Sequence, residues 1–273
     1  MLLGSRVAVI VPAHNEERLI GETLASVPAF VDDVVVVDDA STDRTSERAL
    51  AVDDRRVVVV RHGANRGVGA AIGTGYELAF AAGAEAVAVM AGDAQMDPSD
   101  LSSLLAPALR GEADYIKGDR LSYPGARRRM PVLRWLGNHA LSCLTRCVTG
   151  LSVRDSQCGY TVLSRRAALR LRLARLWPRY GYPNDLLGMV GLAGLRVREV
   201  VVRPIYGTER SGIDLRHALF VVPWVLLRVL ARRLSAGATR LLSADRGWPR
   251  MEQETAVTHG RDGARPLARL PGR

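Results

Sequence analysis

Three junctions between an apolar run and a polar loop hold residues whose types could bind a phosphorylated ligand and a metal ion. They are residues 10–16 (IVPAHNE), 34–43 (VVVVDDASTD) and 88–98 (AVMAGDAQMDP). In an open α/β sheet the carboxyl ends of the strands face one crevice, and ligands bind in that crevice. Carboxylates from such junctions therefore predict a common site for a nucleotide and a divalent metal ion.

The first two junctions offer hydrogen-bonding groups for a base or a ribose. Pro12 to Glu16 form a polar turn, for which the alternative is an ordinary turn with Asn15 as the N-cap of the next helix. Asp38 and Asp39 are adjacent carboxylates at the end of a buried strand, where they cost free energy unless partners satisfy them. A base N–H, backbone N–H groups or a cation could be those partners, and a capped loop is the alternative.

The apolar pattern predicts the elements that position these junctions. Continuous apolar runs at 6–12 and 33–38 are typical of strands that are buried on both faces of a parallel sheet. Further strands are expected at 57–61, 86–91 and 115–117, with helices at 16–27, 42–52 and 69–82. This alternation of strand and helix to about residue 120 predicts a doubly wound α/β sheet.

The second half of the chain is less regular. We expect helices at 132–149, 165–176 and 185–193, a strand within 155–164 and another at 196–202. From Ala218 to Ala231 the chain is apolar apart from Arg228, which is shorter than the roughly 20 apolar residues needed to span a bilayer. Flanking arginines make this segment amphipathic, so we expect it to lie in a membrane interface. A helix packed on the domain is the alternative.

Composition excludes several classes of protein. Hydrophobic residues make up 48% of the chain, which is enough for a full core and excludes a disordered protein. Three cysteines without paired spacing argue against a disulfide framework, and the lack of a signal-peptide pattern favours the cytoplasm. The net charge of +10 attracts phosphates, anionic lipid or nucleic acid. With aromatic residues at 5% and no nucleic-acid motif, we expect no nucleic acid as a partner.

The order of these motifs resembles glycosyltransferase family 2, whose members have the GT-A fold and take sugars from nucleotide-diphosphate donors. The resemblance runs from about residue 6 to about residue 215. It looks nearest to the polyprenyl-phosphate (dolichyl-phosphate) mannosyl- and glucosyltransferases, because of residues 155–160 (DSQCGY) and several arginines. We therefore expect a GT-A-like catalytic domain with a mostly parallel sheet over residues 1–214. An amphipathic helical segment at 215–243 and a disordered tail at 244–273 would follow.

The resemblance also assigns the donor side of the site. The residues expected around the nucleotide are Pro12, Asn15, Glu16, Asp38, Asp39, Asn65, Gly67 and Asp93. In this assignment Asp39 lies beside the base, Asp38 supports its loop, and the loop at Asn65 closes over the nucleotide. The family's Asp-x-Asp motif is reduced, because Ala91 stands at its first position and Asp93 at its second. Asp93 and Gln95, with phosphate oxygens and water, are the expected ligands of Mg²⁺ or Mn²⁺.

The acceptor side follows from the same resemblance. Arg120, Arg134 and Asn138 match positions for the phosphate of a lipid acceptor, and Arg210 is placed near the pyrophosphate. A phosphomonoester, with a second pKa of about 6, is already an anionic nucleophile at neutral pH and needs cationic groups more than a base. An alcohol acceptor would need a base. Asp155 and Asp185 are the candidates for that base, and with Asp93 they are the candidate catalytic carboxylates.

These assignments predict an inverting, metal-dependent hexosyltransferase. It would move a sugar from a UDP- or GDP-linked donor to polyprenyl phosphate, as a cytoplasmic protein bound peripherally to the inner face of the cell membrane. Two alternatives stay open. One is transfer to a hydroxyl of a cell-envelope glycan or natural product, and the other is an inactive protein that binds nucleotide sugars, suggested by the missing carboxylate at Ala91.

Overall fold

The computed structural model describes residues 1–205, 220–236 and the backbone of residues 255–259. Its strands are β1 (Val7–Ala13), β2 (Asp33–Asp38), β3 (Val57–His62), β4 (Ala86–Val89), β5 (Tyr115–Asp119), β6 (Thr161–Ser164), β7 (Val197–Val201) and β8 (Thr255–His259). They form one sheet in the order β7-β5-β6-β4-β1-β2-β3-β8. β6 runs antiparallel to β4 and β5, and β8 antiparallel to β3, whereas the other pairs are parallel. The prediction of an α/β fold with a mostly parallel sheet is confirmed.

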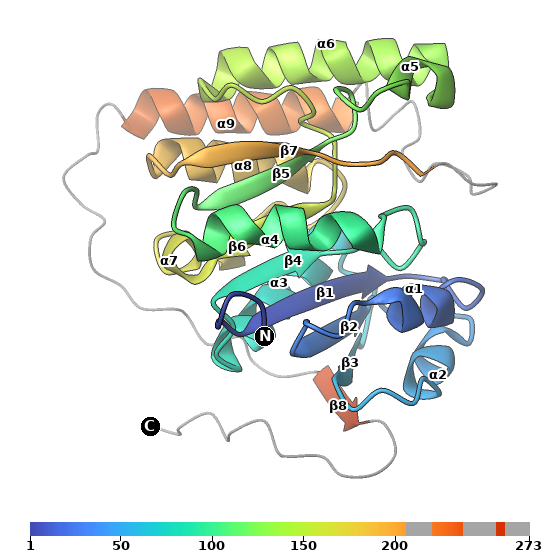
Figure 1. Cartoon of the computed structure of the whole chain (residues 1–273). Coiled ribbons are helices and arrows are strands. Elements are labelled where there is room, and N and C mark those ends of the chain that lie inside the picture. Colours follow the sequence, from blue (N-terminus) through green and yellow to red (C-terminus); the bar gives the residue numbers. More distant parts are fainter. Residues whose placement is uncertain (206–219, 237–254, 260–273) are drawn as a thin grey trace.

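Helices cover both faces of the sheet (Figure 1), and adjacent residues of β1 show why both faces are apolar. Val9 packs on one face and Ile10 on the other, and both side chains are fully buried. The first face carries α1 (Ile20–Ser26), α2 (Thr45–Leu50) and α4 (Leu101–Leu109), and the second carries α3 (Val68–Ala81) and α8 (Tyr182–Leu192). Burial on both faces explains the continuous apolar runs from which these strands were predicted.

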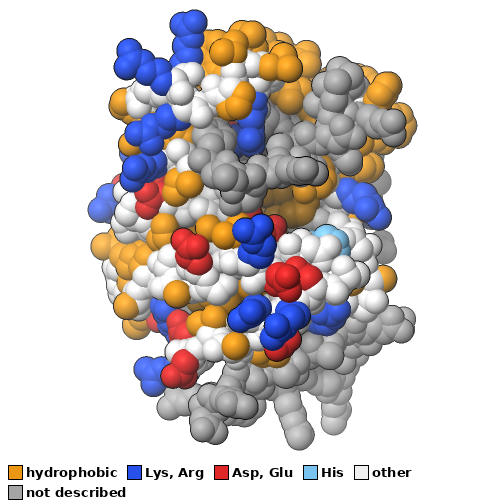
Figure 2. Space-filling view, turned by 90° about the vertical axis from the view of Figure 1, so that its right-hand side faces the viewer, with side chains coloured by type: hydrophobic (Ala, Val, Ile, Leu, Met, Phe, Trp, Pro, Cys, Tyr) orange, Lys and Arg blue, Asp and Glu red, His pale blue; other side chains and the backbone are white. Residues whose placement is uncertain are grey.

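A further layer of two helices lies over α8 at one end of the molecule (Figure 1). α6 (Val132–Thr149) and α9 (Val222–Ala236) contact each other, and both contact α8. Gly188 allows α9 to approach, because a Cβ at that position would lie 2.5 Å from Val229. The opposite face of α9 exposes Trp224 and Leu227, and Figure 2 shows hydrophobic side chains gathered at this end. Within the described ranges, no helix has the length and apolar character needed to cross a bilayer.

The helix predicted at 165–176 is wrong in its length. α7 covers only Arg165–Ala168, and a short 3-10 turn follows at Leu173–Arg175. The buried leucines of this stretch are Leu171, Leu173 and Leu176. Their spacing does not match one face of an α-helix, so a continuous helix could not bury all three side chains. The helix therefore ends at Ala168.

Part of the predicted domain organisation lies outside the described residues. Within the segment expected at 215–243, the structure describes 220–236, which contains α9. Within the tail expected at 244–273, it describes only the backbone of β8, beside β3 at an edge of the sheet. The disordered tail and the separate C-terminal segment therefore stay predictions.

Candidate functional site

The loops after β1 and β2 are joined by hydrogen bonds at the carboxyl edge of the sheet. The Asn15 side chain accepts a hydrogen bond from the Thr42 backbone N–H at 2.8 Å, and the Asn15 backbone N–H donates to Ser41 Oγ at 2.9 Å. The Glu16 backbone N–H donates to Thr45 Oγ1 at 2.7 Å. Asn15 as a helix N-cap is wrong, because α1 begins only at Ile20. Pro12 lies in β1, paired with Val37 of β2, so the turn begins later than predicted. The turn that contains Asn15 and Glu16 is held against the loop after β2.

Asp38 lies beneath that loop and is fully buried. Its carboxylate accepts hydrogen bonds from the Ser41 backbone N–H at 2.8 Å, from Arg61 at 2.7 Å and from the Ser46 hydroxyl. Arg61 also donates to the Ser41 carbonyl at 2.6 Å. These partners satisfy the buried carboxylate, so Asp38 fixes the shape of the loop that carries Asp39.

Asp39 joins the loop after β2 to the loop after β3. One carboxylate oxygen lies 2.7 Å from His62 Nδ1 and accepts the Arg66 backbone N–H at 2.8 Å, and the other accepts the Gly67 backbone N–H at 2.6 Å. His62 Nε2 lies 3.0 Å from Thr74 Oγ1. Burial alone would raise the pKa of Asp39, but the hydrogen bonds from His62 and from the two backbone N–H groups outweigh it and lower this pKa.

His62 is a residue that the sequence reasoning missed. It is buried at the end of β3, directly behind four valines and Arg61. The same transition from a valine run to polar side chains singled out Asp38 and Asp39, so this signal was present in the sequence. What could not be seen is the pairing of an imidazole with a carboxylate 23 residues away.

The lowered pKa of Asp39 predicts a pH-dependent contribution to stability. A carboxyl whose pKa is lower in the folded protein stabilises the fold above its ordinary pKa of about 4, and this contribution is lost as the pH falls through the lowered value. We expect Asp39→Asn to reduce the free energy of unfolding at pH 7 by about 2 kcal/mol, because charged hydrogen bonds are lost. The difference from the wild type should shrink at pH 3.

Urea unfolding at pH 7 and pH 3 measures this effect. Asp53→Asn is the matched control, because Asp53 is an exposed aspartate outside the site, and it should leave stability nearly unchanged at both pH values. A loss in Asp39→Asn that is equally large at pH 3 would contradict the role of the charged carboxylate.

The third junction, after β4, packs against the first. The Gly92 backbone N–H donates to the Pro12 carbonyl at 3.3 Å, and a Cβ at Gly92 would lie 3.3 Å from Ile20. Asp93 is half-buried, and one of its carboxylate oxygens accepts the Gln95 backbone N–H at 3.1 Å. Burial, together with the nearby charges of Asp93 and Glu16, raises the pKa of Tyr180. Asp93, Glu16 and Tyr180 therefore lie around one region at the carboxyl edge.

The predicted metal ligands fit a hard cation that is shared with a phosphorylated ligand. Asp93 and Gln95 supply oxygen donors at the end of β4, and oxygen is what Mg²⁺ and Mn²⁺ prefer. Among the described residues, no group of three or more His, Cys, Asp and Glu side chains could hold a metal ion by itself. One carboxylate suits Mg²⁺ when phosphate oxygens and water complete its coordination. The donor set therefore fits the metal together with a diphosphate.

One predicted acceptor residue, Arg120, forms a charge pair with the buried Asp155. Asp155 is fully buried and accepts hydrogen bonds from Arg120 Nε at 2.8 Å and from the Arg120 NH2 group at 3.0 Å. Burial alone would raise the pKa of Asp155, but the charge and hydrogen bonds of Arg120 lower it. Lys117 is buried nearby and donates to the Cys158 carbonyl at 2.5 Å. The structure thus joins a predicted acceptor residue to a predicted base.

The other predicted acceptor residues lie on α6. Arg134 is half-buried in the first turn, and Asn138 is buried one turn later, where its side-chain N–H group lies 3.6 Å from Met130 Sδ. Asp185 lies elsewhere, buried in the first turn of α8 and paired with Arg232 of α9 at 2.9 Å. Arg210 lies outside the described residues. The two candidate bases are therefore in separate places, and each is bound to an arginine.

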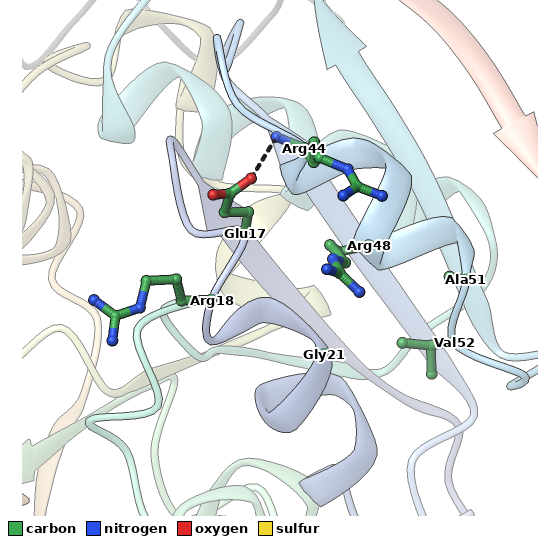
Figure 3. Close-up of a pocket in the computed structure, with 7 residues that line it drawn as sticks. All are labelled: Glu17, Arg18, Gly21, Arg44, Arg48, Ala51 and Val52. Carbon is green, nitrogen blue, oxygen red and sulfur yellow. Dashed lines mark hydrogen bonds between the residues drawn. The ribbon is translucent and has the colours of Figure 1, made fainter.

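A groove of about 600 Å³ between α1 and α2 lies beside these loops (Figure 3). Its lining residues are Glu17, Arg18, Gly21, Arg44, Arg48, Ala51 and Val52. Glu17 accepts the Arg44 backbone N–H at 3.1 Å, and the Arg18 side chain points away from Arg44 and Arg48. This groove contains none of the predicted site residues, so it is separate from the crevice at the carboxyl edge.

Comparison with known proteins places the chain in a family. Residues 8–171 match Glycosyl transferase family 2. The chain is 30% identical to polyprenol monophosphomannose synthase of Mycolicibacterium smegmatis, over 80% of this chain and 85% of that protein. It is 28% identical to UDP-N-acetylglucosamine–dolichyl-phosphate N-acetylglucosaminyltransferase of Methanococcus voltae, over 75% of this chain and 87% of that protein.

A solved structure supports the same assignment. Glucosyl-3-phosphoglycerate synthase from Mycobacterium tuberculosis, in complex with Mn²⁺, UDP and glucosyl-3-phosphoglycerate, is similar with a TM-score of 0.61 and 26% identity. The similarity covers 84% of this chain and 81% of that chain. The fold, the loops at the carboxyl edge and these similarities agree, and the chain belongs to glycosyltransferase family 2 and is a glycosyltransferase.

Proposed function

We propose that this glycosyltransferase moves a sugar from a UDP- or GDP-linked donor to a polyprenyl phosphate at the cytoplasmic face of a membrane. The names of the relatives from M. smegmatis and M. voltae, which specify polyprenol and dolichyl phosphate, support a lipid acceptor. The observation that carries the proposal is an exposed apolar face on two neighbouring helices, α6 and α9, on the acceptor side of the molecule.

This apolar face is formed by both helices. Its exposed members are Val132, Leu133, Leu136 and Leu144 of α6, with Phe220, Trp224, Leu227 and Leu234 on or just before α9. Large contiguous apolar patches are rare on soluble monomers and mark surfaces for a partner or a membrane. Because α6 also carries Arg134 and Asn138, a membrane on this face would bring the lipid phosphate close to the residues predicted to bind it.

Basic residues border the apolar face. Arg127, Arg128 and Arg129 are exposed in α5 (Ala126–Arg129), just before α6, and Arg146 is exposed on α6. Buried apolar area and attraction to anionic lipid are the two contributions that bind an amphipathic surface to a membrane. The combination of apolar and basic side chains therefore favours an anionic bilayer as the partner.

The chemistry then needs few groups from the protein. The acceptor phosphate is already anionic at neutral pH, and Arg134 and Arg120 would orient it towards the donor sugar. The loops held by Asp38 and Asp39 would position the nucleotide. Asp93 and Gln95 would hold Mg²⁺ or Mn²⁺, which neutralises charge on the leaving diphosphate. A single displacement at the anomeric carbon inverts its configuration.

Membrane binding can be tested with vesicles that contain an anionic lipid. We expect Leu136→Glu combined with Leu227→Glu to weaken vesicle binding about tenfold or more. Each change replaces an apolar side chain that would insert into the membrane with a charged one. Leu169→Glu is the matched control, since Leu169 is 81% exposed just after α7 and outside this face. High salt should weaken wild-type binding without abolishing it, because only charge is screened. Wild-type protein that stays in the supernatant at low salt would contradict the membrane assignment.

The acceptor itself can be identified with radiolabelled UDP- and GDP-sugars and a membrane extract. A product in the organic phase that mild acid releases as free sugar would support a polyprenyl phosphate acceptor. A product in the aqueous phase or in a glycan would favour a hydroxyl acceptor instead, and that reaction would need a base within reach of the hydroxyl.

A further inference from the structure

Asp185 is bound on both of its carboxylate oxygens by groups of the protein. One oxygen lies 2.9 Å from the guanidinium of Arg232 on α9, and the other accepts the Trp177 backbone N–H at 2.9 Å. The carboxylate is fully buried, whereas the Arg232 side chain is 30% exposed. A general base has to come within hydrogen-bond distance of the proton that it removes, and Asp185 instead faces α9 and the chain before α8.

The chain before α8, residues 175–181, is called the strap here, and α9 holds it at two further points. The Arg228 guanidinium lies 5.3 Å from the centre of the Trp177 ring and donates to the Arg175 carbonyl at 3.3 Å. The Trp177 indole N–H donates to the Tyr180 carbonyl at 2.9 Å, which closes the strap on itself. A Cβ at Gly181 would lie 3.1 Å from Val225 of α9. The strap is therefore held to α9 directly by a cation–π contact, a hydrogen bond and close packing. It is also held indirectly, because Trp177 donates to Asp185, which is paired with Arg232.

The other side of the strap contacts residues 65–70, called the donor loop here. The Ala70 backbone N–H donates to the Pro178 carbonyl at 3.0 Å. A Cβ at Gly67 would lie 2.5 Å from the Pro178 carbonyl oxygen, and one at Gly69 would lie 2.1 Å from that of Trp177. Both glycines are needed for this approach. Because Gly67 also binds Asp39 at 2.6 Å, contacts run without a gap from Arg232 to the loops after β2 and β3.

We infer that the Asp185–Arg232 pair positions the strap against the donor loop, so that Asp185 is a positioning residue for nucleotide binding and not the general base. The inference rests on the donor half of the proposed function, since it needs the donor loop to contact the nucleotide. Asp185 would have this role whether the acceptor is a lipid phosphate or an alcohol, because the role concerns only the nucleotide.

Calorimetry with UDP and with GDP, each with Mn²⁺, tests the inference on the full chain. Asp185→Asn and Arg232→Gln should each weaken binding of the preferred nucleotide about tenfold, and the double variant should be no weaker than either single one, because both remove the same contact. Arg232→Lys should recover part of the affinity. Arg233→Gln is the control, because Arg233 is the next residue on α9 but donates to the Val148 carbonyl of α6 at 2.8 Å. It should bind as the wild type does.

Kinetics separate positioning from base catalysis. A positioning residue predicts a higher donor KM, a kcat close to that of the wild type at saturating donor, and an unchanged pH–rate profile in Asp185→Asn. Lost turnover with unchanged nucleotide affinity, and with the acidic limb of the profile removed, would show a base and overturn the inference.

If Asp185→Asn and Arg232→Gln prevent folding, a variant outside the buried pair can be used to measure nucleotide affinity. Arg228→Gln loosens the strap without leaving a buried carboxylate unpaired, and it should weaken nucleotide binding several-fold and change the fluorescence of Trp177. Wild-type affinity in Arg228→Gln together with a changed Trp177 fluorescence would show that a loosened strap does not affect nucleotide binding, and it would overturn the inference while leaving the proposed function in place. A wild-type protein that binds neither UDP nor GDP with Mn²⁺ would overturn both.

Discussion

Asp93→Asn is expected to lower turnover about a thousandfold, because it removes the carboxylate that we propose holds the metal ion beside the diphosphate. Asp93 lies half-buried after β4, and the family resemblance places Ala91 at the position of the motif's other carboxylate. The described residues contain no group of three or more His, Cys, Asp and Glu side chains that could hold a metal ion. Turnover in the presence of Mg²⁺ or Mn²⁺, with circular dichroism and thermal unfolding to confirm the fold, measures the effect.

Asp97→Asn is the matched control for this change. Asp97 lies in the same loop, but its side chain accepts the Ser99 backbone N–H at 3.0 Å and caps the turn before α4. Losing part of a cap costs about 1 kcal/mol of stability, so turnover should stay close to that of the wild type. Full activity of the wild type in excess chelator would contradict the metal assignment, and so would undiminished turnover in Asp93→Asn.

Arg120→Ala is expected to lower the free energy of unfolding by about 3 kcal/mol, because it leaves the Asp155 carboxylate buried without its partner. The pair is bidentate, Asp155 is fully buried and Arg120 is only 17% exposed. The double variant Arg120→Ala/Asp155→Asn should recover part of the loss, because it removes the unpaired charge. Urea unfolding of the two variants and the wild type at pH 7 measures this difference.

Acceptor kinetics then separate the structural role of Arg120 from a role in binding. Arg134→Ala should raise the acceptor KM roughly tenfold to a hundredfold with unchanged nucleotide affinity, as expected for a lost charged hydrogen bond to phosphate. If Arg120 also binds that phosphate, Arg120→Ala/Asp155→Asn should show a similar rise at a temperature where it is folded. An unchanged acceptor KM in the double variant would leave Arg120 with the structural role alone.

Local sequence patterns determined the strands and the edge of the sheet at which the site lies. The runs that end in Pro12, Asp38 and Met90 are apolar over several consecutive residues, because a strand covered by helices on both faces has no polar face. Where such a run stops, the polar residues that follow lie at the carboxyl edge. Both properties depend only on neighbouring residues, so the amino-acid sequence by itself predicts them. The family resemblance placed the nucleotide and the metal at the same edge.

The tertiary structure alone decided the partners of the charged side chains. Asp39 is bound by His62, Asp155 by Arg120, and Asp185 by Arg232, 47 residues further along the chain. The sequence shows that each aspartate could serve as a catalytic base or contact a ligand. It does not show that Asp155 and Asp185 are buried against arginines. Burial and pairing arise when distant segments pack together, and they determine whether a carboxylate can reach a substrate. The long α7 expected from the sequence was wrong for the same reason, because burying Leu171, Leu173 and Leu176 outweighed the local preference for helix.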